Sequence, residues 1–339
     1  MRIALVLNTR QDDSEVHAEY DPPHTVDAIR EGIEAAGHEY HFIEGDEAAL
    51  GRVQALKPDL VFNRSEGVRG ESRESHIPAM LEMLGIPYVG SGVLTLALCL
   101  NKEWTKRHVR VAGVPTPQSM LIETEDDLAN ADLMQSAPGF PVILKPNAEG
   151  SSIGINEDNV VHDVSGLQAK ARSMLGAYRE AILVESFIPG REVSVGVLGT
   201  EEGSLEVLPM LEVDFSQLPE EVGNVFGQRA KSTLDDLSHY LCPAPLDAAV
   251  VKRMELSSLA ACRALGIRDF ARLDYRIGSD GVPYFLEVNP LPGMDYDTES
   301  RDYSFFIIMA LRAGLSYSQL VERLLQAAWS RASRPRHHE

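Results

Sequence analysis

Four polar side chains within one β-prone stretch have the residue types and the spacing of a metal site. They are Arg272, Asp274, Glu287 and Asn289. Side chains alternate along a strand, so residues two positions apart share one face of a hairpin. Two carboxylates and a carboxamide suit a hard divalent cation, because Mg²⁺ takes oxygen ligands and commonly binds one or two carboxylates together with substrate phosphates. The alternative is an ordinary hairpin with an arginine–carboxylate pair at its surface.

The turn between the two β-prone runs sets the expected register of this hairpin. Gly278–Gly281 is typical of a tight turn between antiparallel strands. If its two central residues form the loop, Arg272 lies opposite Glu287 and Asp274 lies opposite Phe285. Asp274 and Glu287 are then diagonal neighbours, with their backbones roughly 7–8 Å apart and their carboxylates closer.

The length and charge of the chain limit the classes of protein that it can represent. With 339 residues it should form two or three domains of ~100–200 residues each. The net charge of −20 argues against a nucleic-acid partner, whose phosphates favour a basic surface. Three widely separated cysteines, with no Cys-x-x-Cys pair, predict a reducing cytoplasm and no structural zinc. We expect no membrane association, because the start lacks a signal-peptide layout and the longest apolar run, Val93–Leu100, is too short to cross a bilayer.

Strands and helices alternate over the first hundred residues, which predicts an α/β domain with a parallel sheet. The expected strands are 3–7, 40–44, 60–63 and 86–89, and the expected helices are 24–36, 75–84 and 93–110. No Gly-x-Gly-x-x-Gly motif follows the first strand, so nothing in this region supports a dinucleotide cofactor. Segment 63–74, rich in Arg and Glu, follows a strand end, where open α/β sheets bind ligands. The alternative for this segment is a solvated charged loop.

After residue 117 the pattern changes to α+β. The small, polar loop Asn147–Ile155 follows an apolar strand, and such loops let backbone N–H groups approach phosphate oxygens. A mobile hairpin tip is the alternative. The strand end Glu185–Ile188 could hold a nucleotide base, or it could simply be buried. Lys231 lies in the polar segment 214–241, where by itself it is most simply a solvated lysine. Helices are expected at 247–265, 303–313 and 317–329.

Four blocks, taken in their order and spacing, resemble the D-alanine–D-alanine ligases of the ATP-grasp superfamily. The blocks are 84–92, 140–154, 184–195 and 270–294. The resemblance runs from about Leu60 to Leu325 and implies an α/β protein with the ATP-grasp fold. The expected parts are a Rossmann-like parallel α/β domain at 1–100, two α+β subdomains at 101–195 and 196–330 that grip ATP, and a frayed tail at 331–339.

The resemblance also implies a role for individual residues. The expected ATP contacts are Lys102, Lys145, Glu149, Gly150, Ser151, Ser152, Glu185, Ile188, Glu192, Lys231 and Leu286. The expected catalytic residues are Arg272, Lys231 and Ser151, with Glu71 as an acidic residue on the substrate side. Two Mg²⁺ ions, which Mn²⁺ could replace, are expected on Asp274, Glu287 and Asn289.

The implied activity is an ATP-dependent carboxylate–amine ligase that forms an amide through an acyl phosphate. Its substrates would be small amino-acid or amine molecules, and the resemblance implies a homodimer. A true D-alanine–D-alanine ligase of cell-wall synthesis is one alternative. A carboxylate or small-molecule kinase that stops at the phosphoryl step is a second, and a non-catalytic ATP-binding protein is a third.

Three departures from the family pattern all concern substrate recognition. The first loop, Asn8–Asp21, lacks the family's glycine-rich sequence, and Glu15 and Glu19 are only candidates for its glutamate. Ser232 stands where the family has a tyrosine. The acidic segment 295–301 stands where the family has a Ser-rich segment that binds the acceptor's carboxylate. We therefore expect an altered substrate specificity, with an acceptor other than D-alanine, such as a basic or amine-rich one.

Overall fold

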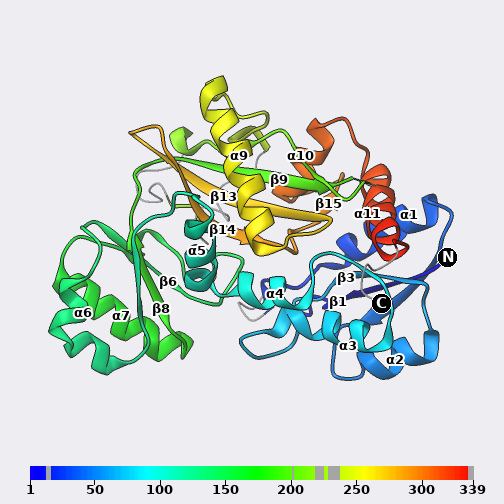
Figure 1. The fold of residues 1–339 in the computed structure, drawn as a ribbon, viewed down its shortest axis with the longest axis horizontal. Helices are drawn as coiled ribbons and strands as arrows, with labels where there is room; N and C mark the ends of the chain where they lie inside the picture. The colour runs from blue at the N-terminus through cyan, green and yellow to red at the C-terminus, as the bar shows by residue number, and fades with distance from the viewer. Residues whose placement is uncertain (13–16, 201, 218–224, 228–236, 335–339) are drawn as a thin grey trace.

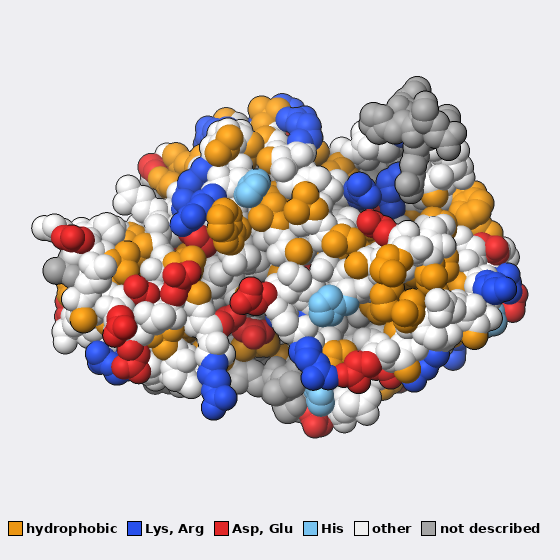
Figure 2. Space-filling model, turned by 60° about the horizontal axis from the view of Figure 1, so that its bottom comes forward, with side chains coloured by type: hydrophobic (Ala, Val, Ile, Leu, Met, Phe, Trp, Pro, Cys, Tyr) orange, Lys and Arg blue, Asp and Glu red, His pale blue; other side chains and the backbone are white. Residues whose placement is uncertain are grey.

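A computed structural model describes residues 1–12, 17–200, 202–217, 225–227 and 237–334 (Figure 1). The described strands form four sheets: a parallel sheet near the N-terminus, two antiparallel sheets, and a two-stranded ribbon of β15 (Tyr296–Asp297) and β16 (Asp302–Tyr303). No described helix is both long enough and apolar enough to cross a bilayer. Figure 2 shows Asp and Glu side chains gathered over the left half of one face.

The N-terminal region forms the parallel sheet that the alternating pattern predicts. Its strands, in the spatial order β2–β1–β3–β4, are β2 (Glu39–Glu44), β1 (Arg2–Leu7), β3 (Leu60–Arg64) and β4 (Tyr88–Val89). Its helices are α1 (Pro23–Ala35), α2 (Ala49–Leu56) and α3 (His76–Leu84). β1 is buried on both faces, as expected for a parallel strand covered by helices, so its apolar run is continuous rather than alternating.

The central region is a four-stranded antiparallel sheet in the order β5–β8–β6–β7. Its strands are β5 (Ser119–Ile122), β8 (Ile182–Ser186), β6 (Val142–Pro146) and β7 (Val160–Val161). The helices α6 (Ala131–Gln135) and α7 (Val164–Tyr178) lie beside this sheet (Figure 1). Leu167, Ala171 and Met174 of α7 pack into one core with β6 and β8, so the helical spacing of these apolar residues serves to cover the sheet.

The C-terminal region contains a six-stranded antiparallel sheet. Its strands are β9 (Gly190–Gly199), β10 (Leu205–Val207), β11 (Leu211–Val213), β12 (Tyr240–Leu241), β13 (Phe270–Gly278) and β14 (Pro283–Asn289). Alternation along β9 divides its side chains between two cores. Val195 packs with the helix α9 (Ala248–Leu265), while Leu198 belongs to the core of α10 (Phe305–Arg312) and α11 (Tyr317–Ala332). The expected boundary at residue 195 falls within β9.

The two ends of the chain meet. α11 packs against α1, and both contribute to one core with the buried residues of β1 (Figure 1). Val321 of α11 lies so close to Gly32 of α1 that a Cβ on that glycine would be 2.8 Å from a Val321 methyl group. The parallel sheet and the C-terminal sheet are therefore joined by a shared apolar core rather than by the connecting chain alone.

The single helix expected at 93–110 is wrong, because the structure has two helices here. α4 (Val93–Leu100) ends and α5 (Lys102–Val111) begins at Asn101, whose backbone is extended. The Asn101 side chain accepts a hydrogen bond from the N–H of Trp104, so it caps α5. The break makes Lys102 the first residue of α5, and its side chain reaches a cavity between the sheets.

Candidate active site

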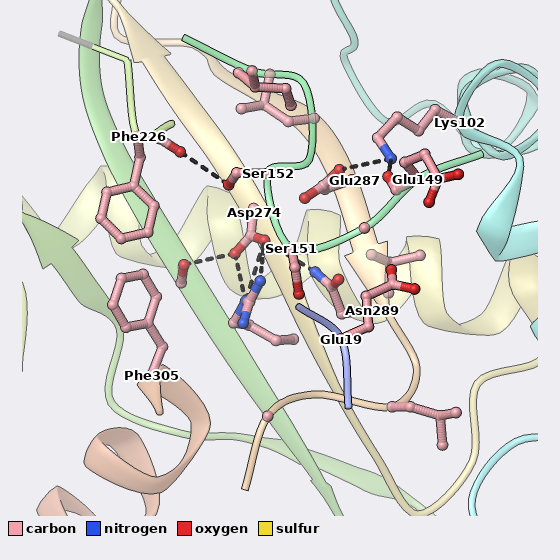
Figure 3. A pocket seen from close by; sticks show the side chains of 18 of the residues that line it. Glu19, Lys102, Glu149, Ser151, Ser152, Phe226, Asp274, Glu287, Asn289 and Phe305 are labelled. Atoms are coloured by element: carbon pink, nitrogen blue, oxygen red, sulfur yellow. Dashed lines mark hydrogen bonds and ion pairs between the residues drawn. The ribbon is translucent and has the colours of Figure 1, made fainter. Parts of the chain in front are cut away.

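A cavity of ≈ 350 Å³ is lined by residues of all three larger sheets. We divide the wall of the cavity into two parts, the lysine half and the acidic half, which are defined by the following residues. The lysine half consists of Lys102, Lys145, Glu185, Glu192, Arg272, Asp274, Glu287 and Asn289. The acidic half consists of Arg10, Glu19, Asp21, Arg64, Glu66, Glu74 and Asp295. Figure 3 shows side chains of both halves projecting toward the same space, among them Glu19 and Asn289.

The four polar residues of the β13–β14 hairpin share one face, as expected, but their predicted register is wrong. Arg272 pairs with Asn289 and Asp274 pairs with Glu287, because the pairing is irregular between Asp274 and Tyr275. Leu286 is the extra residue of this β-bulge, and it lies opposite no residue of β13. The bulge brings the two carboxylate residues directly opposite one another instead of diagonally.

Asp274 is the centre of a hydrogen-bonded group on this hairpin (Figure 3). Its carboxylate accepts bonds of 3.0 Å from Arg272 Nε, 3.1 Å from Asn289 Nδ2 and 2.6 Å from Ser194 Oγ. Arg272 lies over the ring of Phe305 at 5.7 Å, which limits its freedom to move. Contacts with Asp274 thus hold Arg272 and Asn289 in place.

The donor set on this hairpin fits a hard divalent cation. Asp274, Glu287 and Asn289 offer only oxygen ligands, and Lys102 Nζ lies 3.4 Å from Glu287. Burial raises the pKa of Glu287, but the charges of Lys102, Lys145 and Arg272 outweigh it and lower the pKa, so the carboxylate is ionised. Among the described residues no three His, Cys, Asp or Glu side chains could hold a metal alone. A cation bound here would need further oxygen ligands from water or from a substrate.

A buried triad of Lys145, Glu185 and Lys106 lies behind the hairpin. Glu185 Oε1 is 2.5 Å from Lys145 Nζ, and Glu185 Oε2 is 3.1 Å from Lys106 Nζ. Burial raises the pKa of Glu185, but the two lysines outweigh it and lower the pKa to about 2. Lys106 also donates to the carbonyl of Leu286 at the bulge. Sequence reasoning missed Lys106, although it lies four residues after Lys102 on the same face of α5.

The glycine-bearing loop between β6 and β7 closes over the lysine half. Ser151 and Ser152 both have positive φ, 48° and 61°, a conformation that non-glycine residues rarely adopt. Lys102 donates to the carbonyl of Glu149, and Ser152 Oγ donates to the carbonyl of Phe226 at 3.1 Å (Figure 3). Consecutive residues in such turns can form an anion-binding concavity with their N–H groups, which is the function expected of this loop.

The acidic half is built by loops that follow the parallel strands β1 and β3. Arg64 pairs with Asp21 at 2.9 Å, and both side chains are buried. Arg73 pairs with Glu19 at 2.8 Å and reaches Glu149 of the glycine-bearing loop at 3.2 Å. These contacts connect the first loop of the chain to the loop over the lysine half.

Most of the residues expected in the site line this cavity. They are Lys102, Lys145, Glu149, Gly150, Ser151, Ser152, Glu185, Ile188, Glu192, Arg272, Asp274, Leu286, Glu287 and Asn289. Glu71 does not: it is exposed and is absent from the cavity lining, where Glu66 and Glu74 of the same segment lie instead. Lys231, Ser232 and Glu15 lie outside the described residues. Of the two glutamates proposed for the first loop, Glu19 lines the cavity.

The reason that Glu71 differs from Glu74 is local. Segment 63–74 ends in a short 3-10 helix, Arg73–Ser75, which turns Glu74 inward. Sequence periodicity does not reveal so short a turn. Six further lining residues lie in segments that the sequence analysis associated with ligand or substrate, 8–21, 63–74 and 295–301, but none was given an individual role there. They are Arg10, Asp21, Arg64, Glu66, Glu74 and Asp295.

Comparison with protein families and relatives agrees with this geometry. Residues 109–326 match the family model described as "D-ala D-ala ligase C-terminus". A D-alanine–D-alanine ligase of Janthinobacterium sp. is 35% identical over 304 residues, which cover 88% of this chain and 87% of that protein. An uncharacterised protein, y4sG, of Sinorhizobium fredii is 34% identical over 317 residues, which cover 90% of this chain and 87% of that protein.

Solved structures share the fold. The D-alanine–D-alanine ligase of Bacillus anthracis complexed with ATP has a TM-score of 0.75 and 24% identity, and the match covers 98% of each chain. The VanG D-Ala:D-Ser ligase of Enterococcus faecalis has a TM-score of 0.72 and 24% identity, and the match covers 96% of this chain and 99% of that one. The expected α/β ATP-grasp fold is therefore confirmed.

Proposed function

We propose that this chain, which belongs to the D-alanine–D-alanine ligase family and is an ATP-dependent carbon–nitrogen ligase, uses an amine substrate other than D-alanine. The reaction has two steps. A substrate carboxylate attacks the γ-phosphorus of ATP and releases ADP, which leaves an acyl phosphate. An amine then attacks the acyl carbon, inorganic phosphate leaves, and an amide remains. Both steps need positioning and charge neutralisation rather than covalent help from the protein.

The lysine half is the part of the cavity suited to the first step. We infer that Lys102 and Lys145 contact ATP phosphates, that the loop at Glu149–Ser152 covers them, and that Arg272 neutralises the charge that develops on the transferred phosphate. We infer that Glu185, Ile188 and Leu286 hold adenine and that Glu192 holds the ribose. Lys231, for which the resemblance implies a contact to the γ-phosphate, lies outside the described residues.

Asp274, Glu287 and Asn289 are proposed to bind two Mg²⁺ ions, or Mn²⁺ in their place. When bound there, the ions would neutralise phosphate charge and hold the phosphate oxygens in line. Arg272 already binds the Asp274 carboxylate through two hydrogen bonds, one from Nε and one from Nη2, each 3.0 Å long. Metal binding therefore has to compete with this ion pair, which would release Arg272 toward the transferred phosphate.

The observation that carries the substrate proposal is the position of Asp295. It follows Gly293–Met294, where the family resemblance places a segment that binds the acceptor's carboxylate. Asp295 lines the cavity and accepts a bond of 2.7 Å from Thr25 Oγ1, which fixes the carboxylate there. Asp21 is close enough for the charge of Asp295 to raise its pKa, although burial is the larger cause. Asp21 is compensated by Arg64, but Asp295 forms no ion pair with a described residue, so its carboxylate repels the carboxylate of an acceptor such as D-alanine.

The test is ATP-dependent phosphate release with Mg²⁺, measured across D- and L-amino acids, short peptides and polyamines, with mass spectrometry of the products. We expect an amide product from an amine other than D-alanine. Efficient formation of D-alanyl-D-alanine from D-alanine alone would refute the proposed specificity and leave a true D-alanine–D-alanine ligase. Phosphate release that is independent of every amine, without an amide, would support the kinase alternative.

We also infer a homodimer, which rests on the family resemblance. Light scattering of the full chain should give twice the monomer mass, and the mass of a monomer would contradict this inference. The division into parts at residues 1–100, 101–195 and 196–330 remains a proposal as well. Limited proteolysis that releases stable fragments at the connections between the sheets would support it.

A further inference from the structure

Two carboxylates of the acidic half differ from the others in having no partner. Glu66 and Glu74 are each 8% exposed and line the cavity. Neither makes a hydrogen bond or an ion pair with any described residue, whereas Asp21 and Glu19 pair with arginines at 2.9 and 2.8 Å and Asp295 accepts a bond from Thr25. An ionised carboxylate buried without a partner is costly, and its usual solution is a bound cation.

The backbone holds these two carboxylates in position. Gly67 has a φ of +79°, and a Cβ on it would be 2.2 Å from the carbonyl oxygen of Arg73. The residue after Glu66 thus packs directly on the residue before Glu74. The N–H of Gly67 donates a hydrogen bond of 3.0 Å to Asn8 Oδ1, and the carbonyl of Gly67 accepts one of 3.2 Å from Tyr20 Oη. Only glycine allows this approach, so the subsite is rigid before any ligand arrives.

The charges of the acidic half as a whole do not balance. Its wall presents five carboxylates and two guanidinium groups. Arg73, from outside the lining, pairs with Glu19. With all five carboxylates ionised, an excess of two negative charges remains, and Glu66, Glu74 and Asp295 are the three that form no ion pair with a described residue. A simple amino acid is a zwitterion with no net charge and would leave this excess uncompensated. A substrate with a further ammonium group would compensate it.

We propose that Glu66 and Glu74 bind a second, non-reacting ammonium group, so that a substrate of this ligase is a diamino acid or a diamine. This inference rests on the proposed function. An ammonium group has three N–H donors, enough to reach both carboxylates, and charge-assisted bonds of this kind are stronger than neutral ones. The reacting amine must be unprotonated to attack the acyl phosphate, so the group bound here is a different one.

A proton is the competing cation at this subsite. Burial, with the charge of Glu19, raises the pKa of Glu74 to about 7, and burial together with Glu74 raises the pKa of Glu66. Both shifts favour a proton on the pair when no ligand is bound, and an ammonium group would displace it. Two carboxylates that share a site cannot both remain charged without such a partner.

The test compares matched substrates that differ by one amino group, using the full chain with ATP and Mg²⁺. The pairs are 2,3-diaminopropionate with alanine, ornithine with norvaline, and putrescine with butylamine, the amino acids in both enantiomers. Each is supplied alone and with a second amino acid, so that mass spectrometry of the amide shows whether it served as donor or acceptor. We expect the diamino member of at least one pair to have a kcat/KM about 100-fold higher than its partner.

Two variants connect the preference to the subsite. Glu66→Gln and Glu74→Gln keep the shape of each side chain and remove its charge, so each should lower kcat/KM for the diamino substrate by roughly 30-fold or more. Calorimetric titration with ATP checks that each variant is folded. Glu31→Gln, an exposed glutamate on α1, is the matched control and should leave the preference unchanged.

The outcomes separate the two proposals. Equal use of both members of every pair, or an unchanged preference in both folded variants, would overturn the ammonium subsite while leaving the ligase intact. If both variants fail to fold, the comparison of matched substrates with the unmodified chain still decides. Absence of an amide product from all of the substrates would count against the proposed function itself.

Discussion

The two halves of the cavity solve the problem of buried charge in opposite ways. In the lysine half each carboxylate faces a cation of the protein: Glu185 faces Lys145 and Lys106, Glu287 faces Lys102, and Asp274 faces Arg272. In the acidic half Glu66 and Glu74 form no ion pair with a described residue, and the charges of Arg64 and Arg73 act on them only from beyond ion-pair distance. A balanced site can exist empty, and the lysines proposed to contact ATP would then exchange internal pairs for phosphates. An unbalanced site requires a cation from outside.

The two halves also differ in what builds them. Apart from Lys102 on α5, the lysine half stands on strands of the antiparallel sheets, within the residues that match the family model, 109–326. Apart from Asp295, the acidic half lies at the end of β3 and in the segments that follow β1 and β3, before that match begins. Binding residues on loops tolerate change more readily than residues held by strands. Four predictions test this difference between the two halves of the cavity.

The largest effect is expected from Asp274→Asn in the lysine half. The variant keeps the hydrogen-bonding shape but loses one of the carboxylates proposed to bind Mg²⁺, so kcat for phosphate release should fall by about 10³-fold. Steady-state phosphate release measures this, and titration with ATP shows that the protein is folded. Asp280→Asn, at the exposed tip of the same hairpin, is the control. A loss of less than tenfold would contradict the metal assignment.

The second prediction concerns the balance within the buried triad. Lys106→Met leaves Glu185 paired with Lys145 alone among the described residues, and removing one partner of a buried pair costs roughly 3–5 kcal/mol. Urea denaturation should show this loss of stability, and the KM for ATP should rise because the Leu286 carbonyl also loses its donor. Lys252→Met, on the exposed side of α9, should change stability little. A variant as stable as the unmodified protein would show that the triad is not a coupled unit.

The third prediction has the opposite sign and belongs to the acidic half. A carboxyl whose pKa is raised from 4.5 to about 7 on folding contributes stability below pH 4.5 and loses it as the pH rises through 7. The Glu74→Gln variant has no such carboxyl. It should therefore gain up to about 3 kcal/mol of stability over the unmodified protein between pH 4.5 and pH 8.

Unfolding by urea at several pH values measures the difference. The charged groups that act on Glu74 are Glu19, Glu66, Arg73, Lys102 and Arg64, and all of them remain in the variant. A Glu74→Gln protein whose stability changes with pH in parallel with the unmodified protein would show that Glu74 is not held in an unfavourable charged state. The contrast between the two halves would then fail.

The smallest effect on the enzyme is expected from a substitution of Arg73, which contacts both halves of the cavity. Arg73 pairs with Glu19 and Glu149 and donates to the carbonyl of Ala148 at 3.1 Å, so it connects the first loop to the glycine-bearing loop between β6 and β7. Arg73→Met should raise the KM for ATP roughly tenfold, because the loss of a few partly buried bonds is worth about 1–2 kcal/mol. Arg69→Met, exposed on the same segment, is the matched control. Equal KM values in the two variants would show that the halves are independent.

Much of the lysine half was predictable because it depends on local patterns. Alternation along β13 and β14 placed Arg272, Asp274, Glu287 and Asn289 on one face whatever the register. The register itself was wrong, because the bulge at Leu286 is stabilised by Lys106, a residue of another element. The break at Asn101 was missed for a related reason. An asparagine is compatible with the middle of a helix or with a cap, and the surroundings select the cap.

The sequence by itself determined the parallel and antiparallel regions, the family, and most of the residues that line the lysine half, because periodicity and motif order are properties of neighbouring residues. Only the tertiary structure decided which acidic residues enter the cavity and which remain without a partner. Glu71 and Glu74 are three positions apart and chemically identical, yet one is exposed and the other is buried. Their difference arises from the 3-10 helix Arg73–Ser75 and from the contact between Gly67 and Arg73, which together bury Glu74. Whether a buried carboxylate also has a partner depends on distant parts of the chain, as Asp21 does on Arg64.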